Sequence, residues 1–201
     1  MRIDVLVFAG FDELDAIGPF EVFQNAAKSG ADFVVRLVAP DIAGQVTAAH
    51  GLRLRVDVKM GDEPRPDLVI VPGGGWGDGR SEGARAEAAR GVIPKYLAEV
   101  HRAGTVVASV CTGAMLVATA GLLKGRPAIT HWVAVEDLRA AGGGVTNERG
   151  GGDGGGVFSG GGTSGNDLAL WLVQRFAGAE IAAKVAREME HERVGKVWRR
   201  T

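Results

Sequence analysis

The chain has 201 residues, of which 46% are hydrophobic and 23% charged, and its formal net charge is −1. That length fits one domain over residues 1–201 with a sizeable core, and the near-neutral charge without a basic block argues against a nucleic-acid partner. No apolar run approaches the roughly 18 residues of a membrane helix, and the apolar stretch at the N-terminus is too short for a signal peptide. The one cysteine cannot form an internal disulfide. We therefore expect a cytoplasmic globular protein.

Short apolar runs alternate with stretches of helical spacing along the first hundred residues. Phe20, Phe23 and Ala27 share a face at helical spacing and predict a helix that ends at Gly30. Alternating residues in 45–60 indicate a small hairpin or edge strands around Gly51. Buried strands are expected over residues 3–8, 33–38 and 68–71, and an amphipathic helix over 84–103.

The second half begins with a β-branched strand at Thr105–Val107, followed by small residues and a helix over 112–123. A brief strand over 127–131 and a short helix over 132–141 come next. The stretch 142–165 contains 13 glycines among 24 residues. Its fragments 145–146 and 157–159 flank Asp153-Gly154 and predict either a weakly packed hairpin or a flexible linker. Two helices, over 166–176 and 180–197, are expected to close the chain.

This alternation of strands and helices predicts a mostly parallel sheet that is covered on both faces. In such sheets ligands bind beyond the carboxyl ends of the strands. Three loops are expected to meet at that edge, Gly10–Asp15, Pro72–Gly77 and Ser109–Gly113. The candidate site is therefore placed where these loops converge.

Cys111 lies where the central strand turns into a helix, a position that exposes a side chain to the free N–H groups of the helix. Those groups stabilise a thiolate, so we expect a lowered thiol pKa and a nucleophilic cysteine. The alternative is a small buried hydrophobic residue. The glycine run at Pro72–Gly75 is either a simple turn or an oxyanion hole, in which the N–H of Gly74 would act with that of Thr112.

Asp15 ends the loop after the first strand and is the carboxylate best placed to enter the site. It is either the N-cap of the following helix or an acid–base group whose pKa is raised beside the thiol. His131 either completes a Cys-His pair or, with Trp132, forms a packing or interface element. The remaining histidines show no metal-ligand spacing, and no metal site is expected.

Five motifs together resemble one family. They are Leu14–Pro19, Val71–Gly74, Ser109–Gly113, Thr130–Trp132 and Ser164–Leu170. In this order they are similar to the DJ-1/PfpI superfamily, and within it to isonitrile (isocyanide) hydratases and related ThiJ/PfpI-type proteins, over about residues 2–190.

The resemblance implies a flavodoxin-like three-layer α/β sandwich of the class I glutamine amidotransferase-like kind, with a cysteine nucleophile elbow, and usually a homodimer. It also implies a hydro-lyase that converts a small isocyanide to an N-formamide without a metal or organic cofactor. Cys111 would be the nucleophile and Asp15 the general acid and base. Thr112 would contribute its backbone beside the nucleophile. From the glycine loop itself, Gly74 and Gly75 are expected to line the oxyanion or substrate site.

Two features depart from the wider superfamily. Its protease and glyoxalase-type members typically carry histidine directly after the cysteine, where this chain has Thr112. Relatives usually have apolar strand residues around an Asp-Gly turn, where this chain has glycines at 150–156. The alternatives to a hydratase are glyoxalase or deglycase action on α-oxoaldehydes, and a non-catalytic protein that senses redox state or a ligand through Cys111.

Overall fold

The computed structural model describes the whole chain except residues 42–43, 147–149, 153–155, 160–161, 194–196 and 200–201. A seven-stranded sheet forms its centre, in the order β11-β9-β10-β6-β5-β1-β2, and β9 pairs antiparallel with β10 while the other pairs are parallel. In chain order these strands are β1 (Arg2–Leu6), β2 (Val34–Val38), β5 (Leu68–Val71), β6 (Val106–Val110), β9 (Gly150–Gly152), β10 (Gly156–Ser159) and β11 (Val197–Arg199). The predicted mostly parallel α/β sheet is confirmed.

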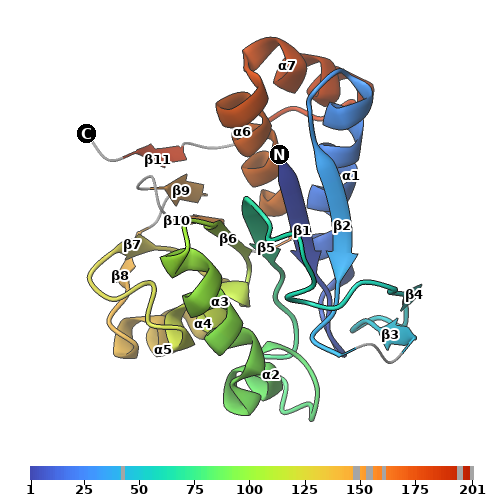
Figure 1. The fold of residues 1–201 in the computed structure, drawn as a ribbon. Helices are drawn as coiled ribbons and strands as arrows, with labels where there is room; N and C mark the ends of the chain where they lie inside the picture. The colour runs from blue at the N-terminus through green and yellow to red at the C-terminus, as the bar shows by residue number, and fades with distance from the viewer. Residues whose placement is uncertain (42–43, 147–149, 153–155, 160–161, 194–196, 200–201) are drawn as a thin grey trace.

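The helices form two groups, one on each side of the sheet (Figure 1). One group comprises α1 (Glu13–Lys28), α6 (Ser164–Ala177) and α7 (Ala179–Glu188). The other comprises α2 (Ala84–Arg90), α3 (Val92–Arg102), α4 (Gly113–Thr119) and α5 (Val135–Ala140), the last preceded by the short 3-10 helix η1 (Trp132–Ala134). Because both faces are covered, every residue of β5 is buried, as its continuous apolar run predicts.

Several predicted boundaries were wrong, and glycines explain two of them. The helix expected over 84–103 is split into α2 and α3 because Gly91 adopts a left-handed conformation with φ of 78°. The helix after Cys111 ends at Thr119, short of Leu123, and Gly121 follows with φ of 79°. The last helix ends at Glu188 rather than at 197, and Glu190 there has φ of 47°.

The smaller strands test the two expected hairpins. β3 (Gln45–Thr47) and β4 (Arg53–Arg55) pair antiparallel around Gly51, which confirms the first one. In the glycine-rich stretch, β10 pairs with β9 rather than with residues 145–146. Val145 instead belongs to β8 (Gly144–Val145), which pairs with β7 (Pro127–Ala128). The expected turn at Asp153-Gly154 lies outside the described residues.

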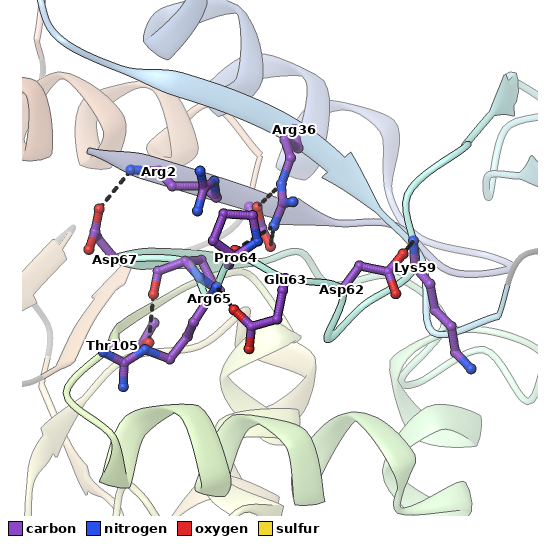
Figure 2. A network of polar contacts seen from close by, with 11 residues as sticks. Arg2, Arg36, Lys59, Asp62, Glu63, Pro64, Arg65, Asp67 and Thr105 are labelled. Carbon is purple, nitrogen blue, oxygen red and sulfur yellow. Dashed lines mark hydrogen bonds and ion pairs between the residues drawn. The ribbon is translucent and has the colours of Figure 1, made fainter.

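The amino ends of the central strands, opposite Cys111, are held by hydrogen bonds that include the segment leading into β5 (Figure 2). Buried Asp4 on β1 receives two hydrogen bonds of 2.8 Å from the Arg36 guanidinium on β2. The Asp67 carboxylate accepts from the Arg2 backbone N–H at 2.7 Å, and the Thr105 hydroxyl donates to the Pro66 carbonyl at 2.7 Å. These contacts fix the starts of β1, β5 and β6, so their carboxyl ends meet in a defined register.

Candidate functional site

Cys111 lies at a sharp turn between β6 and α4, with φ of 55°. A non-glycine residue rarely adopts this left-handed conformation, which is strained and is typical of a nucleophile elbow. The Thr130 hydroxyl donates a 3.0 Å hydrogen bond to the Cys111 carbonyl and holds the turn from the far side. The predicted elbow is therefore present.

The three loops predicted to converge do meet beside Cys111. The Asp12 backbone N–H donates to the Gly73 carbonyl at 2.9 Å, which joins the first loop to the second. The Gly73 N–H in turn donates to the Asp15 carboxylate at 3.1 Å. The Gly74 N–H donates to the Thr112 hydroxyl at 2.9 Å and joins the second loop to the elbow.

This close approach requires glycine at Gly73 and Gly113. A Cβ on Gly73 would lie 2.5 Å from both the backbone nitrogen and the hydroxyl oxygen of Thr112. A Cβ on Gly113 would lie 2.1 Å from the Val71 carbonyl oxygen. Backbone therefore packs directly on backbone at the elbow, and a side chain at either position would push the loops apart.

Asp15 is fully buried on the first turn of α1, with its carboxylate directed at the elbow. Burial, helped by the charge of Asp12, raises its pKa to about 7, although the Gly73 N–H and the Cys111 thiol favour the charged form. Its Oδ1 has no hydrogen-bond partner within the described part of the chain. The helix N-cap is Asp12, which accepts from the Leu14 N–H at 3.1 Å, so the N-cap alternative for Asp15 was wrong.

The thiol of Cys111 does not have the lowered pKa that its position predicts. Burial raises the pKa of the thiol well above its usual range, and the neighbouring Asp15 charge raises it further. The Thr112 N–H acts in the predicted direction and lowers the pKa, but it is outweighed. The resting pair is therefore a protonated thiol beside a carboxyl that titrates near neutral pH, and the charge on Asp15 affects the titration of the thiol.

The predicted oxyanion hole is not formed by the hydrogen bonds in this structure. The Thr112 N–H bonds to the Cys111 sulfur, as expected of a group that stabilises the thiolate, and its contact with an oxyanion remains a prediction. The Gly74 N–H is already used by the Thr112 hydroxyl, so its expected place in the hole was wrong for this conformation. Gly75 has φ of 61°, and its position against the Glu82 carbonyl leaves no room for a Cβ. Its substrate contact remains a prediction.

His131 and Trp132 lie at the start of η1, where His131 acts as the helix cap. The Nδ1 of His131 accepts from the Val133 N–H at 3.4 Å, and its ring lies 5.5 Å from that of Trp132. The contact with Cys111 from this segment comes from Thr130 instead. Trp132 is 79% exposed, so it does not bury itself against the elbow. An interface role for the two residues remains a prediction.

Neither Asp12 nor its neighbour Glu13 was assigned a role from the sequence. Asp12 caps α1, and its charge raises the pKa of Asp15, Cys111 and His50. Glu13 is also engaged, because its carboxylate accepts from the His50 backbone N–H at 2.8 Å and lies 2.6 Å from the His50 imidazole. The signal was available for Asp12, since aspartate before an acidic first turn is typical of a helix start.

Among the described residues, no group of three His, Cys, Asp or Glu side chains could hold a metal ion. In the same part of the chain, no helix is both long and apolar enough to cross a membrane.

Comparison with known proteins places these features in a family. The family model for "DJ-1/PfpI family" matches residues 1–175. An isonitrile hydratase from Pseudomonas putida is 33% identical over 191 residues, which cover 95% of this chain and 78% of that protein. A deglycase from Thermococcus kodakarensis is 30% identical over 145 residues, 71% of this chain and 79% of that protein. A ThiJ/PfpI family protein from Pseudomonas syringae matches in structure with a TM-score of 0.84 and 26% identity, over 95% of this chain and 75% of the other.

Proposed function

The chain belongs to the DJ-1/PfpI family, and we propose that within this family it is an isonitrile hydratase-like hydro-lyase. The proposed reaction adds one water molecule to a small isocyanide and gives an N-formamide. The observation that carries the proposal is the buried Asp15–Cys111 pair at a strained elbow, followed by Thr112 rather than histidine. The 33% identity to an isonitrile hydratase over 95% of this chain supports the same reaction.

The first half of the proposed reaction forms a thioimidate. Near pH 7 about half of the Asp15 groups are ionised, because their pKa is about 7, while the thiol is protonated. Asp15 takes the thiol proton as the sulfur attacks the terminal isocyanide carbon. Asp15 then delivers this proton to the same carbon, so that the thiol has added as H and S across one carbon atom. A weakly acidic thiol next to its own base suits an electrophile that must gain a proton.

The second half hydrolyses this adduct. Asp15, again a carboxylate, takes a proton from water as the oxygen attacks the thioimidate carbon, and it passes this proton to the nitrogen, which gives a neutral tetrahedral adduct with a hydroxyl group. The C–S bond then breaks as Asp15 removes the hydroxyl proton and the formamide carbonyl forms, and Asp15 transfers that proton to the departing thiolate. The net change is the addition of one water, and no electrons are gained or lost. The Thr112 N–H stabilises the thiolate as it forms and leaves.

Incubation with an aryl isocyanide, with N-formamide followed by chromatography, tests the proposal. We expect turnover by the native protein and a loss of at least about 10³-fold in Cys111→Ala and Asp15→Asn. Asp57→Asn, which changes an exposed carboxylate paired with Arg55, serves as the matched control and should retain full activity. Absence of formamide, or an undiminished rate in Cys111→Ala, would contradict the hydratase.

Glyoxalase or deglycase action is the second candidate, and the 30% identity to a deglycase favours it. The same thiol would then attack the aldehyde of an α-oxoaldehyde. Lactate formation from methylglyoxal, measured in parallel, separates the two reactions. We expect little lactate, because the residue after the nucleophile is Thr112, and threonine has no imidazole to move the protons of that reaction.

The family resemblance also supports a cytoplasmic homodimer. Its mass in solution, measured by light scattering after size-exclusion chromatography, tests the dimer, and twice the 20.9 kDa chain mass is expected.

A further inference from the structure

A cavity lies at the carboxyl ends of β1 and β2, apart from Cys111 and Asp15, which do not line it. It has a volume of about 280 Å³, at the low end for small-molecule sites. The ends of β1 and β2, the strand β3 and the helix α2 supply its walls. The lining residues are Phe8, Ala9, Ala39, Pro40, Asp41, Gln45, Val46, Thr47, Glu82, Glu87 and Arg90.

Glu87 is the unusual member of this lining. Its side chain belongs to α2 and the residue is 9% exposed, yet its Oε2 is buried without a hydrogen-bond partner among the described residues. Its other oxygen lies 3.6 Å from the Arg90 guanidinium, a distance too long for a strong hydrogen bond. Burial raises the pKa of Glu87 despite Arg90. A buried carboxyl oxygen without a partner is costly, so a donor from a ligand would be strongly favoured.

The charge of the cavity selects the sign of that ligand. Three carboxylates, those of Asp41, Glu82 and Glu87, face a single cation, Arg90. The Arg90 guanidinium is bound by Asp41 at 2.6 Å and lies 3.6 Å from Glu87, so this one cation offsets the charge of the three acids only in part. The cavity therefore favours a cation and disfavours an anion.

The remaining walls indicate what the cation is attached to. Phe8, Pro40 and Val46 are buried apolar residues on the strand side of the cavity. They would contact a short alkyl chain while its charged end meets Glu87. Among the described residues, the three acids of the lining are not grouped so that they could hold a metal ion, and the apolar walls suit the alkyl part of an organic cation.

We propose that this cavity binds a small primary alkylammonium ion, with its N–H groups donating to the Glu87 carboxylate and its alkyl chain against Phe8, Pro40 and Val46. An N–H donor is required, since the Glu87 oxygen needs a hydrogen bond as well as a charge. The proposal concerns binding alone and does not depend on the reaction at Cys111.

Isothermal titration calorimetry of the full chain with butylammonium chloride tests the site at pH 7.5 and fixed ionic strength. We expect saturable millimolar binding, and at least tenfold weaker binding of tetramethylammonium, which has no N–H donor. Sodium butyrate should give no saturable signal. Glu87→Gln should weaken butylammonium binding at least tenfold, while Glu21→Gln, an exposed acid on α1, should leave it unchanged.

A second variant, expected to bind butylammonium more tightly, tests the proposal even if Glu87→Gln does not fold. Gln45 is exposed and lines the cavity, so Gln45→Glu adds a carboxylate at its rim and should tighten butylammonium binding two- to fivefold. No saturable butylammonium binding, equal affinity for tetramethylammonium, or unchanged affinity in a folded Glu87→Gln protein would each overturn the proposal.

Discussion

Replacing Asp15 with asparagine should make the protein more stable while it abolishes the proposed activity. The folded protein holds the Asp15 proton up to a pKa of about 7, whereas the unfolded chain releases it near 3.8. Between these values the folded state binds more protons, so its free energy of unfolding falls as the pH rises, and it levels off above pH 7. Asparagine keeps an oxygen for the Gly73 N–H and carries no charge to desolvate.

The size of the stabilisation by Asp15→Asn follows from the pKa shift of Asp15. About three pKa units, at about 1.4 kcal/mol each, give a penalty of about 4 kcal/mol for the ionised carboxylate at pH 8. At pH 5 the folded protein keeps the proton and the penalty is about 2 kcal/mol. Asp15→Asn should therefore raise the free energy of unfolding at pH 8, and its advantage over the native protein should shrink by about 2 kcal/mol at pH 5.

Urea unfolding followed by circular dichroism at pH 5 and pH 8 measures both values. Asp57→Asn, at the surface, is the control and should change stability by less than about 0.5 kcal/mol at either pH. If the advantage of Asp15→Asn were the same at both pH values, or if the variant were the less stable protein at pH 8, the assignment of a carboxylate whose burial outweighs its hydrogen bonds would be refuted.

Three further predictions concern the same elbow. Alkylation of Cys111 by iodoacetamide, followed by mass spectrometry, should be slow at pH 7, and its rate should still rise at pH 9. Asp15→Asn should accelerate the alkylation, because the neighbouring charge raises the thiol pKa. A rate that reaches its plateau below pH 7 would contradict this prediction. In urea unfolding, Gly73→Ala should lower the free energy of unfolding by at least about 2 kcal/mol, because its Cβ would lie 2.5 Å from the Thr112 nitrogen. Gly77→Ala in the same loop should be nearly neutral, because the nearest neighbour of its Cβ would lie 3.4 Å away. Thr112→Val should lower the free energy of unfolding by about 1–3 kcal/mol, because it leaves the Gly74 N–H without its acceptor. Thr112→Ser keeps the hydroxyl and should retain most of that stability. Equal losses in both variants would argue against the hydrogen bond.

The parts of the fold that follow from local periodicity were predictable. The apolar run of β5, the face of Phe20 and Phe23 on α1, and the hairpin around Gly51 all appear where the residue pattern places them. Helix ends were less predictable, since the pattern of 84–103 continues through Gly91 although its backbone is left-handed. The partner of β10 was missed because a run of glycines carries no side-chain periodicity to mark a strand.

The site was predictable in its members and less so in its electrostatics. Cys111 at the elbow and Asp15 beside it follow from a strand–helix joint and a neighbouring loop end. The direction of the thiol pKa does not, because it depends on how deeply the pair is buried and on a carboxylate contributed from far away in sequence. The hydrogen bond from Gly74 to the Thr112 hydroxyl likewise depends on a tertiary contact that no local pattern encodes.

The glycine contacts at the elbow have a consequence for how such a site can diversify. Gly73 and Gly113 bring main chain against main chain, so the positions of the thiol and of the helix N–H groups are set by backbone and not by packed side chains. Side chains around the entrance can then be exchanged without moving the reacting groups. Such a scaffold can change its substrate through substitutions around the entrance of the site. We expect differences in specificity among its relatives to arise from those positions.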